Sequence, residues 1–298
     1  MQAFVPDPAL YPFSSHWLRL DDGSLVHYVD EGLGPVLLLL HGNPTWSFLY
    51  RKIIPRLAGR FRCIAPDLPG FGLSVASAGF GFTAAEQAAA MGEFVKALDL
   101  RDAIIFMQDW GGPIGFSIAL RQPERVKGFV IGNTFAWPMM RWGQRVFSRA
   151  MGGWPGRLSA LAFNGVVRAF FASGVRRRLP ADEFRHYLLP FRMRSARRPT
   201  YVFPGELRKA KALLEYVRDG LPALGDKPAL LTWGDSDRAF REQERQRFKK
   251  LFKFHQDVTL HNAGHFIQED APEHICDAIL EWHESLDDRH RHSPGLKN

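Results

Sequence analysis

Continuous apolar runs, alternating with helix-like segments, most constrain the fold of this chain. Residues 36–40 (VLLLL) and 103–107 (AIIFM) are apolar at every position, which is typical of strands buried on both faces of a sheet. Between them, Thr83 precedes Glu86 by three residues at the start of an alanine-rich segment, a pattern that predicts a capped helix. Strands separated by helices indicate an α/β fold, with a mostly parallel central sheet flanked by helices.

The alternation is interrupted in the middle of the chain. From about residue 137 to 215, helix-like segments rich in aromatic residues are punctuated by Gly and Pro, without a clear strand pattern. Strand-like and helix-like runs then resume. We therefore predict a core domain formed by residues 1–136 and 216–298, and a helical cap, residues 137–215, inserted into that core. A chain of 298 residues is long enough for both.

Four short polar motifs follow strand-like runs. They are HGNPTW, QDWGG, WGDSD and NAGH. In open α/β sheets, ligands bind beyond the carboxyl ends of the strands. We therefore expect the four motifs to meet in one functional site at that edge of the sheet.

Asp109, in the motif QDWGG, stands between a buried strand and a glycine-rich helix start. This is the context of the sharp turn G-x-S-x-G that exposes a nucleophile, with a carboxylate in the serine position. Gly111 matches the second small residue, whereas Met107 occupies the position of the first glycine. The helix N-terminus favours an ionised carboxylate, which can attack carbon. Alternatively, Asp109 only caps the helix.

Two later motifs favour chemistry over simple capping. His265, in NAGH, follows the last strand-like run, where a general base can lie. Asp237, in WGDSD, follows the preceding run and can orient the imidazole, although Asp235 competes for that role. In HGNPTW, the backbone N–H of Asn43, together with that of Trp110, can form an oxyanion hole.

Longer segments carry a specific resemblance, which extends over nearly the whole chain. HGNPTWSFLYR, APDLPGFGLS, QDWGGPIGF, NTFAWP, RRPTYVFPGEL, WGDSD and AGHFIQEDAPE together are similar to the haloalkane dehalogenases of the α/β-hydrolase superfamily. The resemblance implies an α/β-hydrolase fold and hydrolysis of a haloalkane to alcohol, halide and proton. Asp109 would form an alkyl ester, and His265, held by Asp237, would activate the water that cleaves it. No cofactor and no metal would be required.

The resemblance also implies a halide site. The indole N–H of Trp110 and the side-chain amide of Asn43 would bind the departing halide. Some branches of the family place the triad acid earlier, as a Glu, where this chain has the sequence NTF at residues 133–135. Asp237 must then serve as the acid. An Asn combined with a late Asp resembles a third branch whose members are often oligomeric, so we expect self-association.

The cap would line an apolar substrate pocket between itself and the sheet. The aromatic content of the chain, 13%, is consistent with such a pocket. Pro204 and Leu207 are favoured because the segment FPGEL resembles the pocket-lining segment of the family. The full set of candidates comprises Phe135, Phe147, Phe163, Phe170, Pro204, Leu207 and Phe266.

Three alternative functions remain open on the sequence. An epoxide hydrolase would use the same Asp–His–Asp residues, but it also needs tyrosines that act as acids and protonate the alkoxide. The cap region offers Tyr187, Tyr201 and Tyr216 for that role. A serine hydrolase would have to use Ser74, which follows a Pro/Gly loop instead of a strand. A non-catalytic small-molecule receptor on the same scaffold is the third.

Charge and cysteine content limit the partners and the compartment. The net charge is +8, and arginines concentrate between Arg141 and Arg208, without an accompanying nucleic-acid motif. We therefore expect a small hydrophobic halogenated substrate and a halide ion as ligands, but neither nucleic acid nor a membrane. Two cysteines, Cys63 and Cys276, and the absence of a signal-like N-terminus favour a cytoplasmic protein.

Overall fold

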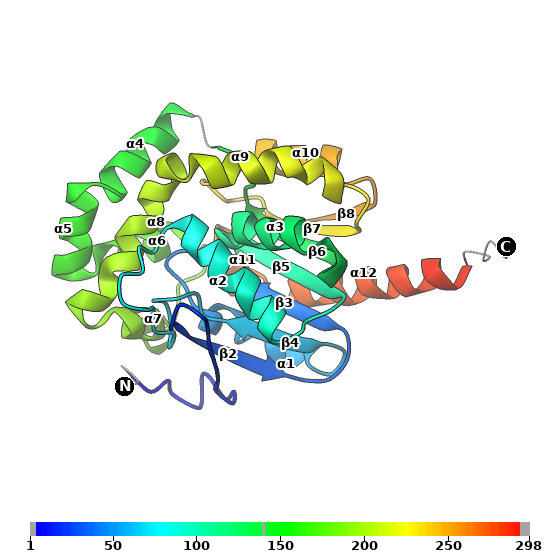
Figure 1. Cartoon of the computed structure of the whole chain (residues 1–298), viewed down its shortest axis with the longest axis horizontal. Helices are drawn as coiled ribbons and strands as arrows, with labels where there is room; N and C mark the ends of the chain where they lie inside the picture. Colours follow the sequence, from blue (N-terminus) through cyan, green and yellow to red (C-terminus); the bar gives the residue numbers. More distant parts are fainter. Residues whose placement is uncertain (1–3, 139–140, 293–298) are drawn as a thin grey trace.

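Eight strands form one sheet in the order β1-β2-β4-β3-β5-β6-β7-β8 (Figure 1). The computed structural model describes residues 4–138 and 141–292, with side chains up to residue 286. β2 pairs antiparallel with β1 and β4, and all the other pairs are parallel. The strands are β1 (His16–Arg19), β2 (Leu25–Glu31), β3 (Val36–Leu40), β4 (Arg62–Pro66), β5 (Ala103–Asp109), β6 (Val126–Thr134), β7 (Ala229–Gly234) and β8 (His255–Leu260).

Twelve α-helices and five short 3₁₀ helices connect and cover these strands in the described part of the chain. The α-helices are α1 (Ile54–Leu57), α2 (Ala84–Ala97), α3 (Gly111–Arg121), α4 (Trp142–Met151), α5 (Trp154–Phe163), α6 (Gly165–Gly174), α7 (Ala181–Leu188), α8 (Arg198–Lys209), α9 (Lys211–Gly220), α10 (Glu242–Leu251), α11 (Ile267–Asp270) and α12 (Pro272–His292). The 3₁₀ helices are η1 (Ser47–Tyr50), η2 (Pro123–Arg125), η3 (Leu189–Phe191), η4 (Arg194–Arg197) and η5 (Leu221–Leu224).

The predicted α/β class, with a mostly parallel sheet flanked by helices, is confirmed. β5 is buried at all seven positions, as expected for a central strand covered on both faces. α2 begins with the predicted capping box, in which Thr83 accepts from the backbone of Glu86 and the Glu86 side chain accepts from the backbone of Thr83. The sequence did not predict β1, because its four residues are too few to show a clear alternation.

Helices α4, α5, α6 and α8 pack on one another, and α7 packs on η3; together they cover the edge of the sheet where the strands β5 to β7 end (Figure 1). α9 packs against α3 of the core instead. The predicted boundary between residues 215 and 216 therefore lies inside α9. Because α9 contacts α3, the whole of this helix belongs with the core. We propose that the inserted cap ends near Ala210, between α8 and α9.

A buried cluster of charges joins the cap to the core. The Glu269 side chain, fully buried at the end of α11, accepts hydrogen bonds from Arg51, Arg177 and Tyr187. Glu183 of α7 accepts from the same arginines, with Arg51 Nη2 at 2.6 Å. Burial raises the pKa of Glu269, but the Arg51 guanidinium outweighs burial and lowers that pKa to about 2. The ionised carboxylate therefore stabilises the packing of cap on core.

Replacing Glu269 with glutamine is expected to lower the free energy of unfolding by about 3–5 kcal/mol, because the buried Arg51 loses one of its two carboxylate partners. The native carboxylate contributes this stability above its ordinary pKa of 4.5 and loses it as the pH falls from 4.5 towards 2. Equilibrium denaturation of both proteins across that range measures the difference. Glu284→Gln is the control, since its exposed pair with Arg60 should contribute at most about 1 kcal/mol. Equal effects of the two substitutions would contradict the account.

Candidate active site

A strained turn presents Asp109 at the end of β5. Its φ is +51°, in the left-handed region that non-glycine residues rarely adopt. Thr134, at the end of β6, donates its hydroxyl to the Asp109 carbonyl and holds the turn. A Cβ at Gly42 would lie 2.2 Å from the Asp109 carboxylate, so only glycine permits this approach of the β3 loop. The turn therefore orients the carboxylate towards the loop after β3.

Met107 fits the turn although the generic pattern has glycine there. Its side chain is fully buried and lies against α3, where a Cβ on Gly115 would come within 3.2 Å of the Met107 sulfur. The absence of a side chain at Gly115 thus leaves room for the larger residue on the strand. The departure from the generic pattern is compatible with the same sharp turn.

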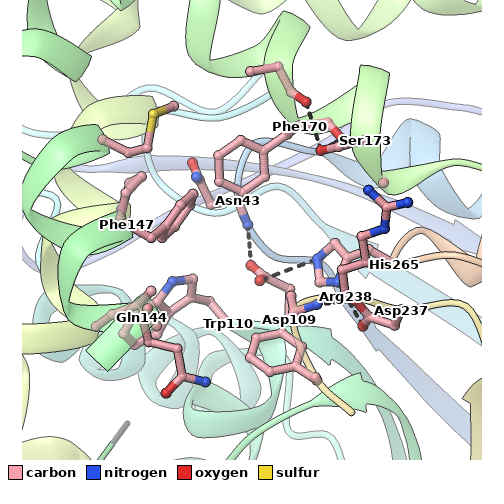
Figure 2. Close-up of a pocket in the computed structure, with 18 of the residues that line it drawn as sticks. Asn43, Asp109, Trp110, Gln144, Phe147, Phe170, Ser173, Asp237, Arg238 and His265 are labelled. Carbon is pink, nitrogen blue, oxygen red and sulfur yellow. Dashed lines mark hydrogen bonds and ion pairs between the residues drawn. The ribbon is translucent and has the colours of Figure 1, made fainter. Parts of the chain in front are cut away.

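Asp109, His265 and Asp237 form one hydrogen-bonded line (Figure 2). His265 Nε2 lies 3.5 Å from Asp109 Oδ2, and His265 Nδ1 lies 3.1 Å from Asp237 Oδ2. The Asp237 side chain is fully buried. Asp235, the competing carboxylate, instead contacts the exposed His261 at 3.1 Å and faces away from the line. The geometry therefore places Asp237, and not Asp235, against the imidazole.

The two carboxylates control the charge of His265. Burial lowers the pKa of the ring, but Asp237 and Asp109 together outweigh burial and raise that pKa to about 10. The two carboxylates therefore favour the cationic form of the ring near neutral pH. Once Asp109 loses its charge, one of the two groups that raise this pKa is gone, so the pKa falls and the neutral ring, which can accept a proton, becomes more populated.

Two side chains near the line had no role predicted from the sequence. The Gln108 amide nitrogen lies 3.0 Å from both His265 Nε2 and the His265 carbonyl, so it restrains the ring. Asn133 donates to the carbonyl of Gly264 and accepts from the N–H of Gly234. It thereby ties together the two loops that carry Asp237 and His265. In the sequence, the only signal for Gln108 and Asn133 is their position near the ends of β5 and β6.

Two side chains that bear N–H groups, those of Asn43 and Trp110, line the same cavity as Asp109. The backbone N–H of Asn43 donates to Asp109 Oδ1 at 2.8 Å. Among the described residues, neither the Asn43 amide nitrogen nor the Trp110 indole nitrogen has a hydrogen-bond partner. The indole is held edge-on between Phe135 and Phe203. Both groups are thus available to an anion that forms beside Asp109.

These residues lie at the base of a cavity of about 620 Å³ beneath the cap. Of the seven predicted wall residues, Phe147, Phe170, Pro204 and Leu207 line it. Phe135 and Phe266 are fully buried behind the wall, where Phe135 packs on Trp110 and Phe266 packs on His265.

Phe163 does not line the cavity. It is the last residue of α5, and its side chain is 76% exposed on the outer surface of the cap. An aromatic residue in a helical segment gives no indication of which face of the helix is outward. The structure also adds lining residues that the sequence did not single out, among them Arg141, Gln144, Met151, Ser173, Arg238, Phe240 and Arg241.

The tyrosines that an epoxide hydrolase would need, and the serine that a serine hydrolase would need, make other contacts or lie outside the cavity. The buried Tyr187 hydroxyl donates to Glu269, and neither Tyr201 nor Tyr216 lines the cavity. Ser74 donates to the carbonyl of Asp67 and accepts from the N–H of His27. Within the described structure, no tyrosine hydroxyl and no activated serine therefore faces Asp109.

Comparisons with known proteins agree with this geometry. A family model described as the alpha/beta hydrolase fold matches residues 35–272. The chain is 45% identical to haloalkane dehalogenase 2 of Mycobacterium bovis over 280 residues, which cover 93% of this chain and 98% of the relative. It is 32% identical to a cis-3-alkyl-4-alkyloxetan-2-one decarboxylase of Xanthomonas campestris, over 90% of this chain and 95% of that protein.

Solved structures of haloalkane dehalogenases are also similar to this chain. The crystal structure of haloalkane dehalogenase DbeA from Bradyrhizobium elkani superposes with a TM-score of 0.86 at 29% identity, covering 93% of this chain and 99% of that one. A structure of a putative ancestral haloalkane dehalogenase superposes with a TM-score of 0.83 at 30% identity. By its fold and its nearly full-length sequence match, this chain belongs to the haloalkane dehalogenases of the α/β-hydrolase superfamily.

Proposed function

We propose that this protein hydrolyses haloalkanes to alcohol, halide and proton through an alkyl ester on Asp109. The observation that carries the proposal is the line from Asp109 through His265 to Asp237, at the base of an apolar cavity. In that cavity, the N–H groups of Asn43 and Trp110 stand beside the nucleophile. Each step of the reaction has a side chain in place.

In the first step, an oxygen of Asp109 attacks the carbon that bears the halogen. The carbon–oxygen bond forms as the carbon–halogen bond breaks, and the bonding pair leaves on the halide. The side chains of Trp110 and Asn43 donate hydrogen bonds to the halide where its charge develops. The product is a neutral ester on Asp109.

In the second step, neutral His265 removes a proton from water, which attacks the ester carbonyl. The backbone N–H of Asn43, already directed at Asp109 Oδ1, and the N–H of Trp110 in the first turn of α3 stabilise the oxyanion. Asp237 stabilises the imidazolium that forms. Collapse releases the alcohol and restores the Asp109 carboxylate, and the proton and halide leave for solvent.

Replacing Trp110 with phenylalanine should lower kcat/KM for a bromoalkane by about 10²-fold, as expected when one preorganised donor is lost. Phenylalanine keeps the packing against Phe135 and Phe203 but removes the indole N–H. Release of bromide, followed with time, measures the effect. Trp17→Phe, at an exposed site on β1, is the control and should leave the rate unchanged. Equal rates for the two variants would argue against the halide role.

A halide-release screen over chloro-, bromo- and iodoalkanes tests the proposal as a whole. The proposal predicts halide and alcohol in equal amounts from at least one of these substrates. The same screen includes an epoxide and a cis-3-alkyl-4-alkyloxetan-2-one, because a relative at 32% identity is a decarboxylase of the latter. Turnover of the epoxide or the oxetanone, with no halide released from any haloalkane, would overturn the proposal.

We further propose that the protein self-associates and acts in the cytoplasm. Trp142, Trp154 and Phe163 are each more than 75% exposed on α4 and α5, which supports association through the cap. Cys63 and Cys276 are buried free thiols, which is compatible with a reducing compartment. No helix in the described ranges is long and apolar enough to cross a membrane.

A further inference from the structure

The rim of the cavity carries the guanidinium of Arg238, which no carboxylate of the described residues neutralises. Arg238, directly after Asp237, lines the cavity and is exposed. Figure 2 shows its side chain extending past His265 towards Ser173. Within the described residues, the Arg238 guanidinium makes no hydrogen bond and no ion pair. Arg141, on the same rim, is by contrast paired with Glu244 at 2.9 Å.

The interior below this rim suits an alkyl chain. Phe147, Phe170, Leu207 and Phe240 provide apolar walls, and the carboxylates that line the cavity, Asp109 and Asp237, belong to the catalytic line at its base. A cavity of about 620 Å³ falls within the range that holds drug-sized ligands. It therefore has room for many carbons beyond the one that reacts.

The cap carries a large excess of positive charge. Residues 137–210 contain 15 Lys and Arg against 3 Asp and Glu, a net charge of +12, whereas the rest of the chain has 24 against 28, a net charge of −4. Such an asymmetry attracts anions to the face that carries the cavity. A neutral haloalkane gains nothing from this field, but an anionic one does.

We propose that the preferred substrates are haloalkanes whose far end carries an oxyanion, with the halogenated carbon at Asp109 and the anionic group bound by Arg238 at the rim. The inference rests on the proposed dehalogenation and specifies its substrate class. The alkyl chain fills the apolar interior, where an unpaired carboxylate would be costly. At the rim, the same carboxylate stays partly hydrated and accepts charge-assisted hydrogen bonds from the planar guanidinium.

The test compares ω-bromoalkanoates, from butanoate to decanoate, with bromoalkanes and ω-bromoalkanols of equal chain length. The measured quantity is the ratio of kcat/KM for the acid to kcat/KM for the bromoalkane. The ratio should rise once the chain is long enough to reach the rim. For acids of that length, Arg238→Gln should lower the ratio by about 5-fold, because the charged pair that it removes is partly exposed. Arg238→Lys, which keeps the charge, should restore part of the preference.

Two controls separate this contact from general charge. Arg149→Gln removes the same charge from the exposed face of α4, outside the cavity lining, and should leave the ratio unchanged. Added salt should lower the ratio more in the native protein than in Arg238→Gln, because it screens the pair that the variant lacks. The ω-bromoalkanols should not respond to Arg238→Gln as the acids do, since they are polar but uncharged.

The outcomes distinguish this inference from the dehalogenation itself. If the native protein releases bromide from bromoalkanes, but Arg238→Gln and Arg149→Gln leave the ratio equally unchanged, the inference about the substrate class is wrong and the dehalogenation stands. Failure to turn over ω-bromoalkanoates of any length would also overturn it. If no bromide is released from any substrate, the proposed dehalogenation fails first.

Discussion

Replacing His265 with glutamine is expected to confine the protein to a single round of bromide release. The first step needs only the Asp109 carboxylate and the halide donors, so one equivalent of halide per site should still form. The second step needs a base for water, and the loss of a general base typically slows such a step by about 10²–10⁴-fold. The alkyl ester on Asp109 should therefore accumulate.

Rapid-mixing measurement of bromide and mass spectrometry of the Asp109 peptide check this result. The burst should approach one equivalent per site, and the peptide should gain the mass of the alkyl group. His261→Gln is the matched control, because His261 follows the same strand but is exposed and pairs with Asp235. Continued turnover by His265→Gln at the native rate, with no modified peptide, would contradict the assignment of His265.

Replacing Asp109 with alanine should abolish turnover without any burst, because no group remains to form the ester. For residues that act as one catalytic unit, loss of a member typically costs about 10⁴–10⁶-fold in kcat. Halide release and the peptide mass should both show no reaction. Asp235→Ala, which removes a carboxylate outside the catalytic line, should keep the burst and the turnover.

The same variant tests the electrostatic coupling in the site. Asp109 is one of the two carboxylates that raise the pKa of His265 to about 10, so Asp109→Ala should lower that pKa. Titration of the imidazole by NMR measures the change. An unchanged pKa would mean that Asp109 does not control the charge of the base.

This coupling explains how one histidine can serve after the nucleophile has reacted. In the free protein, Asp237 and Asp109 raise the pKa of His265 and thereby favour its cationic form. Ester formation neutralises Asp109, the pKa of His265 falls, and its proton can leave for solvent. The neutral ring is then available to take a proton from water. Hydrolysis restores both charges and completes the cycle.

The fold and the sharp turn at Asp109 were predictable because each leaves a local pattern. Uninterrupted apolar runs such as VLLLL indicate buried strands, and a carboxylate between such a strand and a glycine-rich helix start indicates a turn like that of Asp109. The sequence favoured Asp237 as the residue that orients His265 but left Asp235 as a competitor. The two carboxylates are two residues apart in one loop, and only the folded loop shows which of them contacts the imidazole.

The walls of the cavity were predictable only in part. Phe147 and Phe163 both lie in aromatic helical segments of the cap, yet Phe147 lines the cavity and Phe163 faces outward. The packing of α4 and α5 decides this, and no periodicity in such short helices shows it. Arg238 carries no signal in the sequence, because a single arginine after a loop motif is ordinarily a solvated surface residue.

One turnover in water enriched in heavy oxygen tests the central claim, the covalent ester on Asp109, most directly. With protein in excess over a bromoalkane, the alcohol takes its oxygen from the Asp109 carboxylate, and the water oxygen remains on Asp109. The account predicts an unlabelled alcohol and one heavy oxygen in the peptide that contains Asp109. A labelled alcohol with an unlabelled peptide would show that water attacks the substrate carbon directly, and would contradict the account.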